Sequence, residues 1–269
     1  MTRATRAEAI RYAARRPYDN VFIQWVLEGG HGIGAPDGVV LSRDAAGRAR
    51  GLTYFGAQLS LDADDPRALD EFAVETRKHR GLRSFVGPKL AVDGLWDRVR
   101  SWHPPPSIVR ESQPVYALTR EALRERPEAV DVRPARPDEA EIVAYNSGAM
   151  ILGELGYDPR SSRAAFTSAV RRSIALGAWW VWVVDGELRF QLNVGPRTAE
   201  TAQLQGVWTP PAQRGHGYAG LALSAIARRL LATEKTLSLY VNDFNRAAIA
   251  LYEHAGFERV GTFATYLFP

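Results

Sequence analysis

A chain of 269 residues is long for one ordinary domain and comfortable for two. Its apolar share of 46% and charged share of 24% are close to globular averages, which excludes a disordered, collagen-like or coiled-coil protein. Because the chain has no cysteine, a disulfide framework, a thiolate zinc site and a cysteine nucleophile are excluded as well.

The positive charge comes almost entirely from arginine. The chain has 34 Lys and Arg against 30 Asp and Glu, and only Lys78, Lys89 and Lys235 are lysines. Acidic residues are interspersed with the arginines, which argues against a continuous nucleic-acid surface. The longest strongly apolar run, 178–184, is far shorter than the roughly 20 residues of a membrane helix. The N-terminal segment lacks the apolar stretch of a secretory signal, so we expect a cytoplasmic protein that does not span a membrane.

Hydrophobic periodicity and turn residues predict alternating helices and strands in the first part of the chain. We expect helices over 5–15, 18–28, 65–78 and 94–102, two strands around a polar turn within 38–61, and further strands over 82–87 and 114–118. The glycine-rich segment 29–38 follows a predicted helix rather than a strand and is interpreted as a loop. Segment 120–137 is charged, carries three prolines and lacks sustained apolar periodicity. It predicts a boundary between one domain over 1–125 and another over 131–269.

The second part begins with clear helix signals. Pro137, followed by two acidic residues, predicts a helix N-terminus after a short strand near 130–132. A second helix is expected from Ser162 to a capping Gly177, with one apolar stripe along it. Strands are then expected over 178–184, 187–195 and 201–209, the first two joined by an Asp-Gly hairpin turn. This order predicts a mixed α/β architecture.

The most informative stretch reads LQGVWTPPAQRGHGYAGLALSAIARRLLA from Leu204 onward. It combines a buried-looking strand, a turn with two prolines, a glycine-rich loop and an amphipathic helix. The first N–H groups of such a helix have no internal partner and lie at the positive end of its dipole, so they can bind a pyrophosphate. The loop matches neither the GxxxxGK[ST] pattern of nucleotide hydrolases nor the GxGxxG dinucleotide fingerprint.

The loop from Arg214 to Ala219 has the pattern R-x-x-G-x-A, and here the chain resembles the GNAT acyltransferase superfamily, whose acetyl-CoA pyrophosphate loop reads Q/R-x-x-G-x-G/A after a strand. A second signature, LSLYVNDFNRAAIALYEHAGFERVG over 237–261, is similar to the strand and helix that follow in that family. The resemblance covers residues from about 131 to 269. It implies an α/β (α+β) GNAT fold with a mixed central sheet and flanking helices, acetyl-CoA as cofactor with CoA as product, and no metal.

The resemblance also implies roles for individual residues. The strand before the loop would splay from its neighbour and bond the pantetheine arm through the backbone of Val207, Trp208 and Thr209. Amides of the loop would bind the pyrophosphate, and this loop comprises Arg214, Gly215, His216, Gly217, Tyr218 and Ala219, of which the histidine is expected to act through its backbone. Asn245 would contact the pantetheine or the loop, and Tyr252 would protonate the departing thiolate. A backbone N–H near Val207 or Trp208 would stabilise the carbonyl oxygen.

The general base does not follow from the pattern. Many family members carry a glutamate on the strand before the loop, whereas this chain has Gln203 and Gln205 there. Gln205 can orient a water molecule but cannot accept its proton. Glu154 is the preferred candidate because its segment borders the acceptor site in the family, and Asp158 is the second. An amine with a low pKa would need no protein base, since solvent can take the proton.

The first half coarsely repeats the element order of the second. Its segment RRPYDNVFIQWVLEGG resembles the N-terminal module of a group of bacterial two-domain GNAT proteins, which implies a smaller, degenerate GNAT-like domain. Its loop position carries Asp62, Asp64 and Asp65, which would repel a pyrophosphate, so we expect no CoA site there. The module would cover one side of the acceptor cleft or serve as an interface. Trp180 and Trp182 share one face of a strand and are expected in the core, or alternatively as a wall of an acceptor pocket.

The leading hypothesis is an acetyl-CoA-dependent N-acetyltransferase that transfers an acetyl group to a primary amine of a small molecule or peptide by direct attack in a ternary complex. The missing strand carboxylate motivates a second hypothesis, a non-catalytic acyl-CoA sensor or regulatory protein. A third is a transferase that uses another acyl-CoA or a hydroxyl acceptor. The edge at TFATYLF, residues 262–268, could pair with a second copy in a homodimer or with the first domain.

Overall fold

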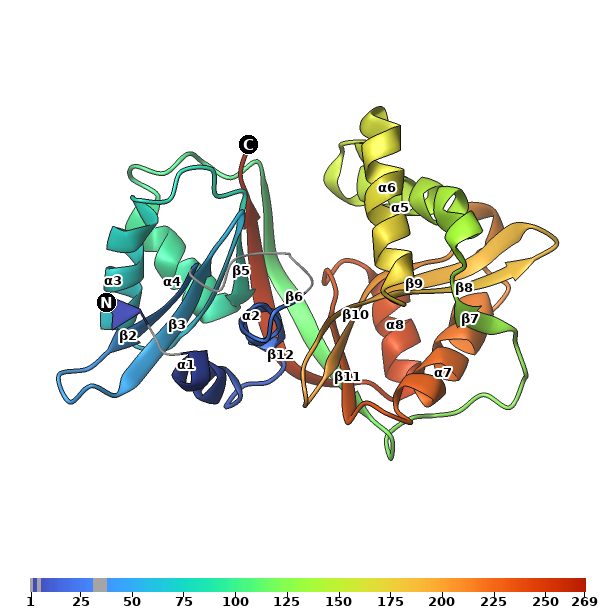
Figure 1. Ribbon diagram of the computed structural model, residues 1–269, viewed down its shortest axis with the longest axis horizontal. Helices are drawn as coiled ribbons and strands as arrows, with labels where there is room; N and C mark the ends of the chain where they lie inside the picture. The colour runs from blue at the N-terminus through green and yellow to red at the C-terminus, as the bar shows by residue number, and fades with distance from the viewer. Residues whose placement is uncertain (1, 4–5, 31–37) are drawn as a thin grey trace.

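The computed structural model describes residues 2–3, 6–30 and 38–269 (Figure 1). Most of the predicted glycine-rich loop over 29–38 therefore lies outside the described residues, as does the first residue of the helix predicted over 5–15. Helices and strands are interspersed along the chain, and the described strands join one sheet of 12 strands. The predicted mixed α/β fold is confirmed.

The first half needs three corrections to its predicted elements. It contains β1 (Thr2–Arg3), α1 (Arg6–Ala13), α2 (Val21–Leu27), β2 (Val39–Arg43), β3 (Ala49–Phe55), β4 (Gln58–Ala63), α3 (Pro66–Thr76), β5 (Ser84–Pro88), α4 (Lys89–Val99) and β6 (Ile108–Thr119). Three strands replace the two predicted within 38–61, because the chain turns at Gly56. Helix α4 begins before residue 94, and β6 begins before residue 114. Gly94 lies inside α4, where a Cβ would be 2.7 Å from Leu69 Cδ1, so the glycine allows α3 and α4 to approach closely.

The second half follows its predicted order. It contains β7 (Val132–Pro134), α5 (Ala140–Leu155), α6 (Arg163–Ala175), β8 (Trp179–Val184), β9 (Glu187–Arg197), β10 (Ala202–Trp208), α7 (Tyr218–Leu230), β11 (Thr236–Tyr240), α8 (Arg246–Ala255) and β12 (Glu258–Leu267), with short 3₁₀ turns at Pro137–Glu139, Pro159–Ser162 and Pro211–Gln213. The hairpin between β8 and β9 turns at Asp185 and Gly186, both with positive φ. The helix predicted from Ser162 is α6, and Ser162 is its N-cap.

Both halves use the same succession of elements. In the first, β2, β3 and β4 form an antiparallel meander, and β5 returns parallel to β4 after α3. In the second, β8, β9 and β10 form the meander, and β11 returns parallel to β10 after α7. A helix and a last strand then follow in each half, α4 and β6 in one and α8 and β12 in the other.

The last strands of the two halves are exchanged. Strand β12 pairs antiparallel with β5 through Phe263–Leu267, and β6 pairs antiparallel with β11 through Val115–Thr119. The two exchanged strands also pair with each other at the centre of Figure 1. Both sides of segment 262–268 are thus occupied within the chain, which favours pairing with the first domain over pairing with a second copy. The domain limits 1–125 and 131–269 stay a prediction, because the shared strands make the sheet continuous.

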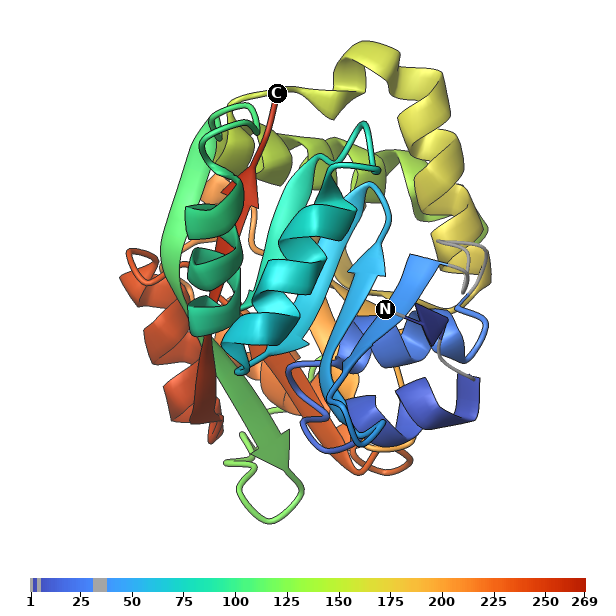
Figure 2. The same cartoon turned by 90° about the vertical axis from the view of Figure 1, so that its left-hand side faces the viewer.

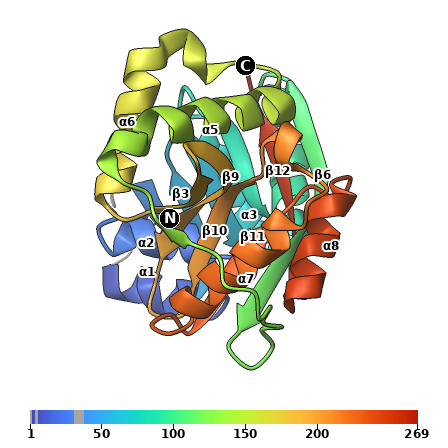
Figure 3. The ribbon, with the colours of Figure 1, turned by 90° about the vertical axis from the view of Figure 1, so that its right-hand side faces the viewer.

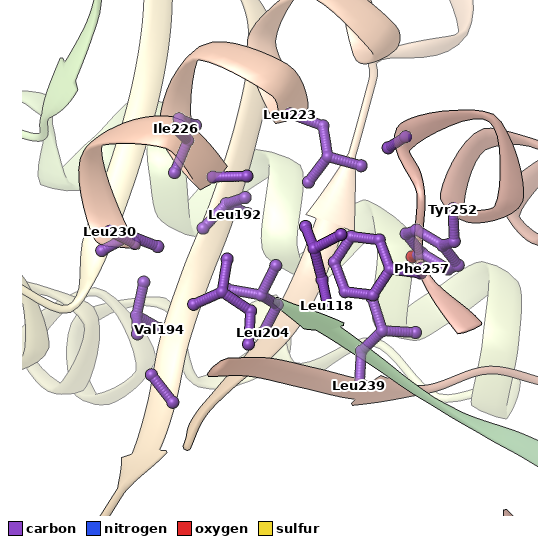
Figure 4. Packing of buried hydrophobic residues seen from close by; sticks show 14 of the residues in the cluster. Leu118, Leu192, Val194, Leu204, Leu223, Ile226, Leu230, Leu239, Tyr252 and Phe257 are labelled. Carbon is purple, nitrogen blue, oxygen red and sulfur yellow. The ribbon is translucent and has the colours of Figure 1, made fainter. Parts of the chain in front are cut away.

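Helices cover both faces of the sheet (Figures 2 and 3). In the first half, α3 and α4 bury Phe72 and Leu95 on one face, and α1 and α2 bury Ile23 on the other. In the second half, α5 and α6 pack against β8 and β9, and α7 and α8 cover the opposite face. Figure 4 shows that β6 brings Leu118 into the core beneath α7 and α8. No helix in the described part of the chain is long and apolar enough to cross a membrane.

Gly256, the residue after α8, packs closely against the segment that follows β6. Its φ is 100°, and a Cβ there would lie 2.0 Å from the carbonyl oxygen of Ala122. We expect Gly256→Ala to lower the free energy of unfolding by roughly 1–2 kcal/mol through backbone strain, and by about 1–3 kcal/mol more through the clash.

The matched control is Gly177→Ala, because Gly177 has a φ of 70° and no atom within 4 Å of its Cβ position. Urea unfolding of both variants measures the difference. Equal losses of stability would contradict the packing role of Gly256.

Candidate active site

Strands β10 and β11 separate soon after they meet. Their parallel pairing covers two residue pairs, the second of them Gln203 with Ser238. On its other side, β10 shifts register beyond Gln205, where Gly206 has a φ of 58°. A bulge of this kind frees backbone groups from the ladder. The end of β10 can therefore offer N–H groups to a ligand, and the splay implied by the resemblance is present.

A cleft of about 590 Å³ opens where the two strands separate. Most of the predicted site residues line it, namely Glu154, Val207, Trp208, Thr209, Arg214, Gly215, Gly217, Tyr218, Ala219, Asn245 and Tyr252. His216 and Gln205 are not among its lining residues. The fold thus brings the end of α5, the end of β10, the glycine-rich loop and α8 to one place.

The N-terminus of α7 borders this cleft without a side-chain cap. Its N-cap is Gly217, with a φ of 76°. Helix α3, at the same point in the first half, begins at Asp65, whose carboxylate accepts hydrogen bonds from the amides of Arg67 and Ala68. The first N–H groups of α3 are therefore hydrogen-bonded to its own aspartate, whereas those of α7 remain available to an anion.

Arg124 and Arg126, which follow β6, also line the cleft. The sequence pattern indicates only a charged linker in their segment. Nη1 of Arg126 lies 3.2 Å from the Cβ position of Gly220 in the first turn of α7. Hydrogen bonds hold the segment in place, from the Arg126 amide to Ser224 Oγ at 2.8 Å and from the Arg124 amide to the Ala255 carbonyl at 3.0 Å. These arginines add positive charge to the open end of α7.

Ring contacts order the glycine-rich loop. Arg214 Nε donates to the Thr209 carbonyl at 3.1 Å, and its guanidinium lies 4.7 Å from the ring centroid of Trp208. The His216 ring stacks on Tyr218 with a centroid distance of 5.3 Å. The His216 ring thus packs on Tyr218, and the contribution of His216 through its backbone stays a prediction.

Two predicted side chains are partly engaged by the protein itself. Asn245 Oδ1 accepts from the Ala248 amide at 3.2 Å and caps α8, which leaves its amide group for a ligand. Gln205 Nε2 donates to Gln203 Oε1 at 3.0 Å, and both glutamines line a second cavity rather than the cleft. The predicted role of Gln205 in orienting a water molecule would therefore apply in that second cavity.

Tyr252 is almost completely buried where α8 lines the cleft. Burial raises the pKa of its hydroxyl above the ordinary value, and the negative charge of Glu154 raises it further. The same two causes raise the pKa of Tyr240, on β11. Both hydroxyls therefore keep their protons at neutral pH, and Glu154 acts electrostatically on both.

Glu154 lies in the last turn of α5, at the mouth of the cleft. The residue is exposed to solvent, and partial burial of its carboxyl by neighbouring protein atoms raises its pKa, against the opposing charge of Arg110. Arg110, on β6, also donates to the Glu154 carbonyl at 2.6 Å. A carboxyl with a raised pKa beside a cleft is a candidate general base. Asp158 is less suited, because hydrogen bonds from Arg160 lower its pKa.

The second cavity, of about 690 Å³, lies on the other side of β10, between the two halves. Trp180 and Trp182 line neither cavity, and both pack against the core under α7 and α8, as expected for core residues. Within residues 6–30 and 38–269, no group of three or more histidine and acidic side chains could hold a metal ion.

Comparisons with known proteins match separate parts of the chain. Residues 38–143 match a domain of unknown function (DUF4081), and residues 196–267 match the FR47-like protein family. Over 87 residues the chain is 37% identical to the uncharacterized N-acetyltransferase YjgM of Escherichia coli (strain K12), a match that covers 31% of this chain and 52% of that protein. The chain thus spans about half the length of this curated relative.

Solved structures extend the likeness to the whole chain. An X-ray structure of a Drosophila protein has a TM-score of 0.69 and 14% identity, covering 100% of this chain and 97% of its own. A GCN5-related N-acetyltransferase from Sphaerobacter thermophilus has a TM-score of 0.62 and 17% identity, covering 98% of this chain and 93% of its own. These likenesses show that the chain has the fold of GNAT proteins. The GNAT fold implied by the loop at 214–219 and the signature at 237–261 is confirmed.

Proposed function

We propose that this protein is a member of the GNAT superfamily and an acetyl-CoA-dependent N-acetyltransferase whose acceptor is the primary amine of a small molecule or peptide. The observation that carries the proposal is the uncapped N-terminus of α7, flanked by Arg126, in a cleft that also contains Tyr252. The E. coli relative YjgM is named as an N-acetyltransferase, which supports the same reaction class. A cytoplasmic location is part of this proposal.

The residues of the cleft fit the cofactor. Amides from Gly215 to Ala219, together with the guanidinium of Arg126, would bind the pyrophosphate. Gly215 leaves room for it, since no atom lies within 4 Å of its Cβ position. The backbone of 207–209, which β11 does not pair, would bond the pantetheine arm. When bound, acetyl-CoA supplies the acyl group as a thioester.

Three groups of the chain would assist the transfer, in which a C–N bond forms and a C–S bond breaks. The Glu154 carboxylate would take the proton from the acceptor ammonium, directly or through water. A backbone N–H near Val207 would donate to the carbonyl oxygen as negative charge develops on it. Tyr252 would give its hydroxyl proton to the departing sulfur, a role that requires the protonated state that burial maintains.

A second candidate function is a non-catalytic acyl-CoA sensor, which is favoured by the absence of a carboxylate from the Gln203–Gln205 segment of β10. CoA binding without turnover on a panel of amines would support it. A transferase for another acyl-CoA or for a hydroxyl acceptor would use the same site, and the mass of the product would identify it.

Calorimetric titration of acetyl-CoA tests the cofactor site. Arg126→Glu reverses one exposed charge and should weaken binding about 10- to 100-fold, because a hydrogen bond to a charged group contributes about 1.5–3 kcal/mol. Arg228→Glu is the matched control, since Arg228 lies on α7, pairs with Glu125 at 3.6 Å and does not line the cleft. Gly217 is less suitable for substitution, because its φ of 76° would strain any side chain. No binding by the wild type, or equal weakening in both variants, would contradict the site.

Tyr252→Phe tests the proton donor. We expect kcat to fall by about 10²- to 10⁴-fold, the usual contribution of a general acid, while acetyl-CoA affinity stays near that of the wild type. Tyr116→Phe is the control, because its hydroxyl donates to Glu253 at 2.8 Å and does not line the cleft. Wild-type turnover by Tyr252→Phe at several pH values would remove the assignment.

Glu154→Gln tests the base. Because the pKa of Glu154 is raised, the wild-type kcat/KM should fall as the pH drops through that pKa and the carboxylate becomes protonated. The glutamine variant should be slower above that pKa and should lack this step. Asp158→Asn should keep the wild-type profile, since its carboxylate is bound to Arg160. An unchanged profile in Glu154→Gln would assign proton removal to solvent.

A further inference from the structure

The second cavity is built by both halves of the chain. The first half contributes α2 and the residues before it, together with β4 and β5, and the second half contributes α6, β9, β10, β11 and β12. Strand β10 contributes to both this cavity and the cleft, because Gln203 and Gln205 line the cavity and Val207 lines the cleft. A volume of about 690 Å³ suits a small organic molecule.

Asp19 supplies the one carboxylate among the described lining residues of this cavity. It makes no hydrogen bond or ion pair with any described residue. The cation that acts on it, Arg16, is already bound to Asp62 at 2.9 Å and to Asp64. Burial raises the pKa of Asp19 to about 6, and the charges of Asp62 and Asp64 contribute to the rise. An unneutralised carboxylate in a cavity favours a cationic ligand.

Aromatic side chains form much of the apolar wall. Phe22 and Trp25 of α2 lie with their ring centroids 6.1 Å apart, and Tyr240 and Phe263 lie 5.3 Å apart. Such rings bind flat apolar groups and organic cations. The combination with Asp19 favours an organic ammonium compound over a metal ion or a purely polar ligand.

The cavity is electrostatically linked to the proposed site of acyl transfer. Tyr240 lines the cavity and Tyr252 lines the cleft, and the charge of Glu154 raises the pKa of both hydroxyls. The cavity and the cleft also adjoin along β10, since Gln205 lines the cavity and Val207, two residues further on, lines the cleft together with Glu154. A molecule in the cavity could thus present one end at the splay between β10 and β11.

We propose that this cavity binds the acceptor, and that the acceptor is a small organic molecule in which an apolar body separates the reacting amine from a second cationic group that pairs with Asp19. The term acceptor rests on the proposed N-acetyltransferase function, whereas the binding of a dication does not. Two arginines also line the cavity and could bind an anionic ligand instead. Arg197 is paired with Glu234, whereas the side-chain partner of Arg172 is the neutral Ser168 Oγ, to which it donates at 3.0 Å, so Arg172 is the main competing charge. An acceptor with a carboxylate held by Arg172 is therefore the rival ligand.

Three benzylic amines that differ at one end test the proposal by calorimetry. They are 1,4-bis(aminomethyl)benzene, 4-(aminomethyl)benzyl alcohol and 4-(aminomethyl)benzoate, titrated with and without CoA, which carries no acyl group to transfer. The diamine should bind about tenfold tighter than the alcohol, because its second ammonium forms a charge-assisted hydrogen bond. In Asp19→Asn the diamine should lose this advantage. Asp97→Asn is the matched control, since Asp97 pairs with Arg100 and does not line the cavity, so the tenfold preference should persist.

Tightest binding of the benzoate would overturn the proposal in favour of Arg172, and equal binding of all three compounds, or none at millimolar concentration, would overturn it outright. Acetyl-CoA binding by the wild type and its loss in Arg126→Glu are measured separately. Failure of the acetyl-CoA site and failure of the acceptor cavity are therefore distinguishable.

Unfolding stability gives a readout that does not depend on a ligand. A carboxyl whose pKa is raised by folding costs stability as the pH rises, because the unfolded chain ionises it more easily. Asp19→Asn should therefore have a higher Tm than the wild type at pH 8, and the difference should shrink as the pH falls from 8 to 5. A lower Tm for Asp19→Asn at pH 8 would mean that the carboxylate has a structural partner, and would overturn the proposal.

Discussion

Hydrogen bonding between β12 and its two neighbours, β5 and β6, holds both halves of the chain in one sheet. Without β12 the edge of β5 would be open, and without β6 the edge of β11 would be open. The exchange also carries side chains of the first half into the second. Arg110 reaches Glu154 because it lies on β6, and Arg126 reaches the start of α7 because β6 delivers the segment that follows it. The cleft is therefore assembled from both halves of the chain.

A single residue distinguishes the two equivalent helix N-termini. Asp65 folds its carboxylate onto the first amides of α3, which neutralises the positive end of that helix internally. Gly217 has no side chain to do so, and its left-handed backbone turns the loop toward the amides of α7. The connection between β4 and α3 thus stabilises the first half, whereas the equivalent connection between β10 and α7 leaves an anion site in the second half.

Local chemistry explains what could be predicted from the sequence. The loop at 214–219, the start of the helix at Asp65 and the hairpin at 185–186 each depend on residues within a few positions of one another, and each was predicted at the right place. The predicted start of α4, at Gly94, lies after its actual start at Lys89, because a glycine is typical of a helix boundary. Gly94 lies inside the helix instead, where the lack of a side chain allows close contact with Leu69 of α3.

The long-range features were not predictable in this way. Arg126 lies in a segment whose composition indicates only a linker, and its place at α7 depends on the exchange of β6. Asp19 has no motif around it, and its lack of an ion pair is explained only by the structure, in which Arg16 binds Asp62 instead. Tyr240 lies in β11, whose apolar sequence predicts only a strand of the core. In each case the partner is far away in the sequence, so no local pattern marks the residue.

The central position of β12 has a consequence for biosynthesis. Because a ribosome makes the chain from its N-terminus, β2 to β6 emerge well before the strand that must fill the gap between β5 and β6. Pairings of such long sequence separation form slowly. Until they form, β5 and β6 expose unpaired edges of the kind that promote aggregation. We therefore expect the nascent first half to depend on chaperones, or on the ribosome's own shielding, until residues 258–267 have left the exit tunnel.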